Sequence, residues 1–179
     1  LATAPFAQST DFKIWVPNNF DGKFLGTITL RKALAVSRNI AAINLITHIG
    51  PPLVVELARK AGIVATLEAV PALALGSSAV SPIEMTSAFG TFANGGIAVT
   101  PYTVERVEDA SGKQLQGHIP IEREAMTPQL AYLTTSLLKG VVNNGTAVYA
   151  RKLNRPLAGK TGTSNDNRDL WFIGYTPDL

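Results

Sequence analysis

Two short runs of strand-forming residues close the chain, and a polar segment separates them. The runs are Leu-Ala-Gly-Lys-Thr-Gly-Thr at 157–163 and Trp-Phe-Ile-Gly-Tyr at 171–175, a pattern that is typical of an antiparallel hairpin. The first run carries a lysine and two threonines, which supply a positive charge and hydroxyl donors. Gly162 lies between the threonines, and a glycine inside a strand lets another group approach the backbone. The hairpin therefore predicts a strand edge suited to a carboxylate.

Helical segments are expected before this hairpin. Periodicity and turn residues place them at about 30–49, 53–61, 82–94 and 128–144. Thr29 is a suitable N-cap, Ser81-Pro82-Ile83-Glu84 is a capping box, and Thr127-Pro128 opens the last helix. A weakly alternating strand at 99–107 and a return strand at 114–119 flank a turn. Helices followed by an antiparallel hairpin predict an α+β fold, a helical cluster with an antiparallel sheet.

Composition excludes several classes of function. The 179 residues are 46% hydrophobic and 16% charged, which suits one globular domain with a core. The net charge is +3, but the basic residues are scattered without interleaved aromatic residues, so no nucleic-acid partner is expected. Cysteine is absent and His48 and His118 are far apart, so we expect no metal and no cofactor. No run has the length of a bilayer span, and no signal peptide is visible.

Two short motifs carry chemistry. Ser37-Arg38-Asn39 has the form S-x-N, and Lys160-Thr161-Gly162 has the form K-T-G. Together with S-x-x-K, such motifs form the serine acyl-transfer sites of penicillin-binding proteins and class A β-lactamases. Residues i and i+2 of a helix do not face the same side. Ser37 and Asn39 can both line a cleft only if the helix breaks there, so we expect a short non-helical connection at 37–39.

The flanks of both motifs resemble class A penicillin-binding proteins, the membrane-anchored enzymes that build and cross-link peptidoglycan. The similar segments are 15–22, 26–39, 73–76, 81–85, 92–96, 142–147 and 159–177. They cover most of the chain in the order of the family. The resemblance implies a penicillin-binding/serine β-lactamase-like transpeptidase domain. It also implies that residues 1–179 are a partial transpeptidase domain, incomplete at both ends, without the family's glycosyltransferase domain and membrane anchor.

The resemblance implies a role for each motif residue. Ser37 passes a proton to the leaving group, and Lys160 holds Ser37 and supplies positive potential. Asn39 bonds the substrate amide. Thr161 and Thr163, with Gly162 between them, bind the carboxylate of a D-Ala-D-Ala stem peptide or of a β-lactam, and the Thr163 N–H is an oxyanion donor.

The nucleophilic S-x-x-K motif has no suitable match in the chain. Residues 10–13 offer a threonine in place of the serine, and Ser136-Leu137-Leu138-Lys139 lies between the other motifs, in a helix whose residues look like core. We expect the attacking serine in a preceding segment of the same protein, outside this chain. The chain alone is therefore expected not to be acylated.

The resemblance implies a peptidoglycan D,D-transpeptidase on the periplasmic, extracytoplasmic face of the inner membrane, with stem peptides and β-lactams as its ligands. A D,D-carboxypeptidase or a β-lactamase-type hydrolase stays open as an alternative. Glu56, Glu68 and Glu84 have ordinary helix or cap interpretations, so no base for water is evident. A non-catalytic peptidoglycan-binding relic that lost its nucleophile also stays open.

Overall fold

The computed structural model describes residues 8–9, 14–164 and 168–178. Its α-helices are α1 (Leu30–Ala35), α2 (Asn39–Ile49), α3 (Pro51–Lys60), α4 (Pro82–Ala93) and α5 (Pro128–Asn144). Its 3-10 helices are η1 (Pro71–Leu75) and η2 (Val148–Leu153). Its strands are β1 (Gln8–Ser9), β2 (Ile14–Trp15), β3 (Ile97–Val99), β4 (Arg106–Glu108), β5 (Gln114–Gly117), β6 (Glu122–Glu124), β7 (Ala158–Thr163) and β8 (Leu170–Tyr175).

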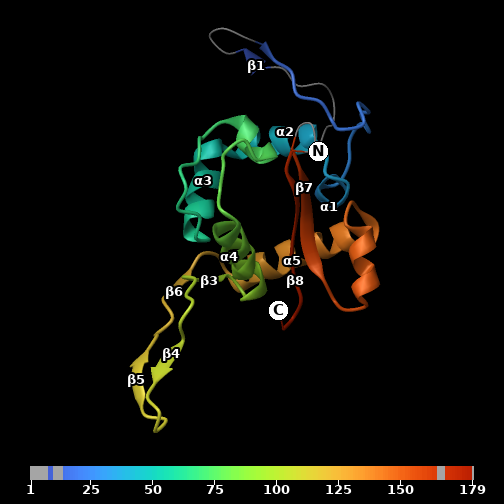
Figure 1. Ribbon diagram of the computed structural model, residues 1–179. Coiled ribbons are helices and arrows are strands. Elements are labelled where there is room, and N and C mark those ends of the chain that lie inside the picture. Colours follow the sequence, from blue (N-terminus) through green and yellow to red (C-terminus); the bar gives the residue numbers. More distant parts are fainter. Residues whose placement is uncertain (1–7, 10–13, 165–167, 179) are drawn as a thin grey trace.

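The centre of the molecule is formed by α5 and the β7–β8 hairpin. Helix α5 packs against α1, α4 and β7, and α4 also contacts β8 and β3. Figure 1 shows α4 and α5 in the middle of the molecule, with the long β7–β8 ribbon beside them. Helix α2 contacts α1, α3 and η1, and Ala58 of α3 packs against a cluster that includes Ala88 of α4. This arrangement confirms the α+β fold with helices and antiparallel sheets.

Apolar side chains on both sides of α5 make much of the core, and a further cluster joins Ala61 and Ile63 to Ala88 of α4. Leu138 of α5 packs with Ala158 and Tyr175 of the hairpin, and Val141 packs with neighbouring residues of the segment before β7. Leu34 of α1 contacts both groups. Because such burial contributes about 2 kcal/mol for each large side chain, α5 ties α1 and β7 into one unit.

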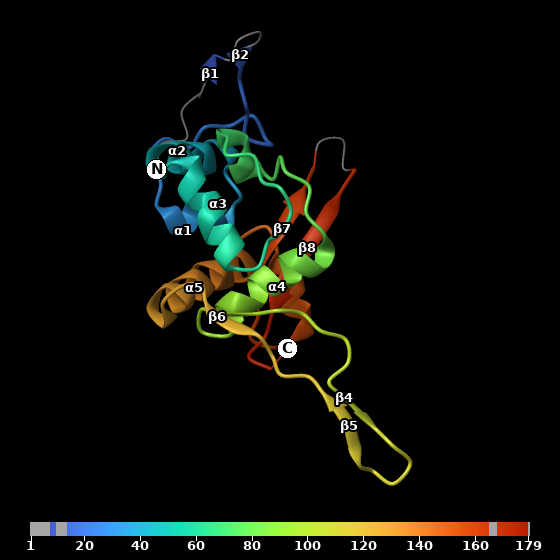
Figure 2. The same ribbon diagram turned by 90° about the vertical axis from the view of Figure 1, so that its left-hand side faces the viewer.

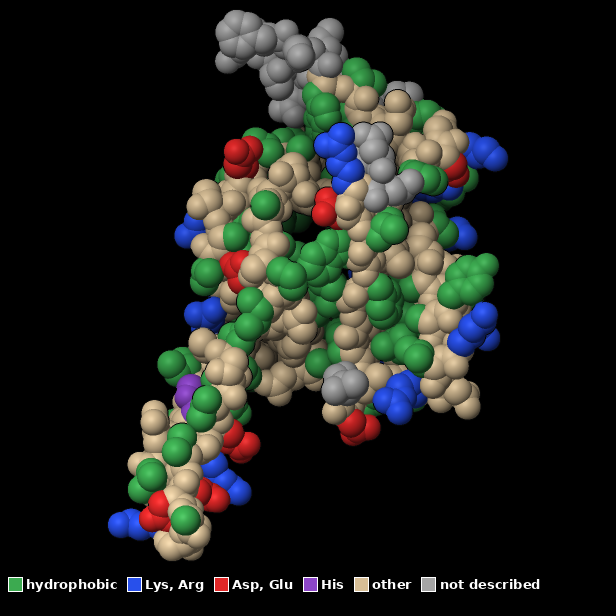
Figure 3. All heavy atoms as spheres, viewed as in Figure 1, with side chains coloured by type: hydrophobic (Ala, Val, Ile, Leu, Met, Phe, Trp, Pro, Cys, Tyr) green, Lys and Arg blue, Asp and Glu red, His purple; other side chains and the backbone are tan. Residues whose placement is uncertain are grey.

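The strands of the described residues pair antiparallel, β1 with β2, β3 with β6, β4 with β5 and β7 with β8. The register of the last pair sets Lys160 opposite Ile173 and Gly162 opposite Trp171. The β4–β5 hairpin projects away from the body in both views (Figures 1 and 2). In the space-filling view its surface mixes charged and apolar side chains (Figure 3).

Most predicted elements are confirmed. Thr29 and Thr127 cap α1 and α5 with their side chains, and Ser81 and Glu84 form the complete capping box of α4. The continuous strand expected at 99–107 is wrong, because β3 ends at Val99 and β4 begins only at Arg106. Pro101 lies in this gap and has no N–H for a strand ladder.

Two segments considered in the sequence analysis lie outside the described residues. They are residues 10–13 and the middle of the last polar turn, 165–167.

None of the described helices is by itself long and apolar enough to cross a membrane. Helices α2 and α3 meet that test only as a pair bent by 94°.

Candidate active site

The chain breaks between α1 and α2 at Ser37. Helix α1 ends at Ala35, Ser37 has a positive φ of 52°, and α2 begins at Asn39. The N–H of Arg38 donates to Ala33 O at 2.9 Å, which closes the last turn of α1. The predicted break in the helix is therefore confirmed, but it covers residues 36–38, and Asn39 is already the first residue of α2. A serine in the left-handed region is conformationally strained.

Lys160 on β7 reaches this turn. Its Nζ donates to Ser37 Oγ at 2.8 Å and to Thr161 O at 2.8 Å. Side chains alternate along a strand, so Lys160 shares the face of Ala158, which is buried against the helices. Burial lowers the pKa of Lys160 below its ordinary value of 10.5. The sequence motifs 123 positions apart thus meet as one hydrogen-bonded pair.

The register shows which backbone groups β7 leaves unpaired. The N–H of Ser164 donates to Asp169 O at 3.0 Å, next to the pair Thr163–Leu170. Hydrogen-bonded and non-hydrogen-bonded pairs alternate along an antiparallel ladder. The peptide groups of Thr163 and Thr161 therefore point away from β8, in agreement with the Lys160 bond to Thr161 O. No described strand pairs with that edge of β7, so the N–H of Thr163 faces an open edge.

Thr161 has a partner that the motif analysis did not single out. Its hydroxyl lies 2.6 Å from the hydroxyl of Thr146, and the N–H of Thr146 donates to Ala35 O at 3.0 Å. Gly145 makes this approach possible, because a Cβ there would lie 2.0 Å from Ala35 O. In the sequence, the only signal for Thr146 is that it lies in segment 142–147, one of the segments that carry the family resemblance.

Asn39 is held by the segment before α1. Its Nδ2 donates to Asn18 O at 2.8 Å. The neighbouring Asn19 is buried, and its Oδ1 accepts the N–H of Ile40 at 3.3 Å. Asn19 thus caps α2 from a distance, since Arg38 at the N-cap position makes no side-chain cap bond.

Arg38, the middle residue of the S-x-N motif, is anchored to the same segment. Its two Nη atoms donate to the two carboxylate oxygens of Asp21 at 2.5 and 3.0 Å. The Arg38 side chain is only 12% exposed. The hydrogen bonds from Arg38, followed by that from the Lys23 N–H, lower the pKa of Asp21 to about 2. This two-pronged pair fixes the turn that carries Ser37.

The glycines of β7 differ in the space around them. A Cβ at Gly162 would touch only Trp171 Cβ, at an ordinary 3.6 Å, whereas a Cβ at Gly159 would lie 2.7 Å from both Ile173 O and the Phe172 ring. Gly159 is required by packing. Gly162 and Thr163 are exposed, and packing with the described residues does not require a glycine at 162.

The other candidate groups are engaged elsewhere. Ser136 accepts hydrogen bonds from Arg31 at its carbonyl and its hydroxyl, at 2.7 and 3.1 Å. Glu56 pairs with Lys60 at 2.7 Å, and Glu84 accepts the N–H groups of residues 64, 65 and 81. Within the described ranges, no group of three or more His, Cys, Asp or Glu side chains is placed to hold a metal ion.

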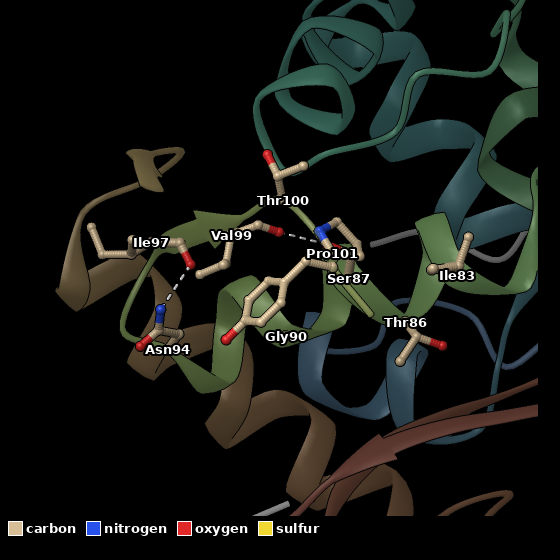
Figure 4. A pocket seen from close by; sticks show the side chains of 10 residues that line it. Ile83, Thr86, Ser87, Gly90, Asn94, Ile97, Val99, Thr100 and Pro101 are labelled. Atoms are coloured by element: carbon tan, nitrogen blue, oxygen red, sulfur yellow. Dashed lines mark hydrogen bonds between the residues drawn. The ribbon is translucent and has the colours of Figure 1, made fainter. Parts of the chain in front are cut away.

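A hollow of about 460 Å³ lies between α4 and the segment 97–102, away from Ser37 and Lys160 (Figure 4). Its polar groups serve the fold, because Ser87 Oγ donates to Val99 O at 3.1 Å and Asn94 Nδ2 donates to Ile97 O at 3.2 Å. The remaining lining is mostly apolar, with no lysine, histidine or carboxylate among the lining residues. It offers none of the groups that acyl transfer needs.

The chain is similar in sequence to known proteins over nearly its whole length. The sequence profile described as "Penicillin binding protein transpeptidase domain" matches residues 3–178. The chain is 37% identical to penicillin-binding protein 1A of Rickettsia bellii, over 97% of this chain and 25% of that protein. It is also 37% identical to penicillin-binding protein 1A of Aquifex aeolicus, over 98% of this chain and 24% of that protein.

A solved structure has the same fold. The crystal structure of penicillin-binding protein 1A from Haemophilus influenzae superposes with a TM-score of 0.90 at 26% identity, covering 98% of this chain and 32% of that chain. The chain thus spans about a quarter of the length of the curated relatives it matches.

Proposed function

Because the chain belongs to the penicillin-binding protein transpeptidase family, we propose that it forms one wall of the acyl-transfer site of a peptidoglycan D,D-transpeptidase. The observation that carries the proposal is the 2.8 Å hydrogen bond from Lys160 Nζ to Ser37 Oγ. It joins the S-x-N and K-T-G motifs, which acyl transfer by this family's chemistry needs in one place. Residues 1–179 are accordingly part of a transpeptidase domain.

Ser37 acts as the proton relay. A serine ester forms when the nucleophile attacks the D-Ala-D-Ala peptide bond, and the departing amine needs a proton. The Ser37 hydroxyl both donates and accepts, so it gives its proton to that amine and takes up in its place the proton that the attacking serine hydroxyl loses. Lys160 holds Ser37 by its hydrogen bond and adds positive potential beside the developing charge.

The edge of β7 binds the acyl donor. The Thr163 N–H, which faces the open edge, stabilises the oxyanion of the tetrahedral intermediate. The hydroxyls of Thr161 and Thr163 bind the substrate carboxylate, and Gly162 leaves room for it. Thr146 orients the Thr161 hydroxyl through their 2.6 Å contact. A β-lactam ring and its carboxylate occupy the same place as the stem peptide.

Asn39 binds the peptide through its carbonyl oxygen. Its Nδ2 is already committed to Asn18 O, and no hydrogen bond to its Oδ1 occurs among the described residues. This oxygen accepts the N–H of the substrate amide. The attacking serine belongs to an S-x-x-K motif beyond residues 1–179, and the whole protein works on the periplasmic side of the membrane.

A labelled penicillin tests the proposal. Full-length protein is expected to form a stoichiometric covalent adduct, which maps to a serine outside residues 1–179, whereas the chain 1–179 alone is expected to form none. A full-length protein without an adduct would contradict the transpeptidase function. An adduct on the isolated chain would instead show that the nucleophile lies within it. Incubation of the full-length protein with a donor stem peptide and an amine acceptor then separates transfer to the amine from hydrolysis.

A further inference from the structure

A polar hollow of about 510 Å³, distinct from the hollow beside α4, lies between the C-terminal half of α5 and the segment that leads into β7. Helix α5 contributes Lys139, Val142 and Asn143, and the segment contributes Arg151, Asn154, Arg155, Pro156 and Leu157. None of these residues belongs to the Ser37–Lys160 site. The hollow is therefore a separate feature of the surface.

Its lining is positively charged. Lys139, Arg151 and Arg155 line it, and the lining residues include no carboxylate. Arg38, Lys60 and Arg106 each pair with a carboxylate, but in the part of the chain that the structure describes none of the three lining cations has such a partner. Three unneutralised charges around one concavity attract an anion that itself carries several charges.

The backbone around the hollow is held in a tight shape. The N–H of Asn154 donates to Arg151 O at 3.0 Å and ends η2 with Asn154 at a φ of 50°. Pro156 follows and fixes its own φ, and Val142 on the opposite wall is buried. The backbone that carries the two guanidinium groups is therefore constrained, which lowers the backbone entropy that ligand binding would remove.

We propose that this hollow, formed by Lys139, Arg151 and Arg155, binds an anion that bears phosphoryl groups and at least two negative charges. Each guanidinium matches two phosphoryl oxygens with parallel N–H donors, and the lysine adds a point charge. Asn143 and Asn154 supply amide donors on opposite walls. A soluble phosphorylated compound and an anionic phospholipid headgroup share this chemistry.

Isothermal titration of the full-length protein with sodium pyrophosphate tests the proposal. Saturable binding is expected, and the double variant R151Q/R155Q is expected to weaken it about 25-fold, or about fivefold for each lost charge. The matched control is K152Q. Lys152 lies in the same segment but does not line the hollow, and its Nζ lies 5.6 Å from the centre of the Tyr149 ring. K152Q is expected to change the affinity less than twofold.

A second variant guards against a folding defect. K139Q removes a charge from the other wall, on an exposed helical position, and is expected to weaken pyrophosphate binding about fivefold with an unchanged melting temperature. The proposal is overturned if pyrophosphate binding is not saturable, if K152Q weakens it as much as R151Q/R155Q, or if tricarballylate binds equally well. The last result would assign the hollow to carboxylates.

Vesicles separate the two sources of the phosphoryl group. Vesicles of phosphatidylglycerol and phosphatidylcholine, compared with phosphatidylcholine alone, are added to the wild type and to R151Q/R155Q. Binding that the double variant loses and pyrophosphate competes away supports a lipid headgroup. Pyrophosphate binding with no such vesicle dependence supports a soluble ligand. Neither outcome depends on acylation by penicillin, so the inference and the transpeptidase function fail separately.

Discussion

Lys160 Nζ donates a 2.8 Å hydrogen bond to Ser37 Oγ and so joins strand β7 to the turn between α1 and α2. Each side chain comes from an element that the hydrophobic core fixes, because Leu34 of α1 and Ala158 of β7 pack in the same cluster. The pair is therefore positioned by burial of neighbouring apolar residues and not by its own bond alone.

Replacing Lys160 by alanine is expected to slow acylation of the full-length protein by penicillin about 10²- to 10⁴-fold, the range of a positioned proton-transfer group. The second-order rate constant of acylation is the measurement. Lys113→Ala, in the turn of the projecting hairpin, is the matched control and is expected to leave the rate unchanged. An unaltered rate in Lys160→Ala would remove Lys160 from the mechanism.

The same lysine predicts an alkaline limit. Burial lowers the pKa of Lys160 below 10.5, and the role proposed for this lysine requires its positive charge. The acylation rate is therefore expected to fall as the pH rises through this lowered pKa, before an exposed lysine would lose its charge. A rate profile that stays flat up to the ordinary pKa of lysine would contradict the proposed role of the charge.

The two glycines of β7 predict opposite kinds of defect. A Cβ at Gly159 would lie 2.7 Å from Ile173 O, so Gly159→Ala is expected to destabilise the fold by about 1–3 kcal/mol, the usual cost of overpacking. A Cβ at Gly162 meets only an ordinary contact, so Gly162→Ala is expected to keep the stability and lose penicillin binding. Urea unfolding and acylation, measured on both variants, check the two effects. If Gly162→Ala is acylated normally, the ligand does not approach that position.

The Arg38–Asp21 pair predicts a coupling that reaches Ser37. Arg38→Ala and Asp21→Ala each break the pair and are both expected to slow acylation, whereas the double variant is expected to be no slower than the worse single variant. Glu56→Ala breaks the exposed pair with Lys60 and serves as the control. Additive losses in the double variant would show that the two residues act independently of each other.

Glu84 predicts loss of stability in acid. Hydrogen bonds from Ser81, followed by the N–H groups of Ala65 and Val64, lower the pKa of Glu84 from 4.5 to about 2. A carboxyl group with a lowered folded pKa stabilises the fold above its unfolded pKa and loses that contribution as the pH falls from about 4.5 to about 2.

Glu84→Gln is expected to lower the midpoint of urea unfolding at pH 6 and to flatten its decline between pH 5 and pH 2. Glu122→Gln, at an exposed position of β6, is the control and is expected to follow the wild type. An acid decline that is as steep in Glu84→Gln as in the wild type would show that other carboxylates cause it.

Local signals in the sequence predicted the elements that depend on local contacts. The capping box at Ser81 and the cap at Thr127 are each settled within a few residues of chain. The break at Ser37 was predicted only from the S-x-N motif, because no Gly or Pro in the segment favours it. Strand β6 was missed because its partner, β3, ends 23 positions earlier, and nothing in Glu-Arg-Glu alone predicts a strand. Pairing between distant segments is decided by tertiary packing, which the pattern of one segment does not contain.

The site divides in the same way. Two motifs predicted that Ser37 and Lys160 belong to one site, and the structure brings their side chains into contact. The partners of the neighbouring motif residues Thr161 and Arg38, which are Thr146 and Asp21, were not predicted. The contact of Thr146 with Thr161 depends on the close approach of Gly145 to Ala35. The pairing of Asp21 with Arg38 depends on the path of the segment before α1. Both are contacts between elements, so only the folded arrangement reveals them.

At position 37 the backbone conformation favours glycine, whereas the contact with Lys160 requires a hydroxyl. Glycine adopts φ = 52° without the steric cost that serine incurs there, so a glycine at this position would relax the backbone. The same substitution would remove the hydroxyl that accepts the hydrogen bond from Lys160 and, with it, the proposed relay. Stability-guided engineering of this domain therefore has to exclude position 37, because the substitution that relaxes the backbone removes this oxygen.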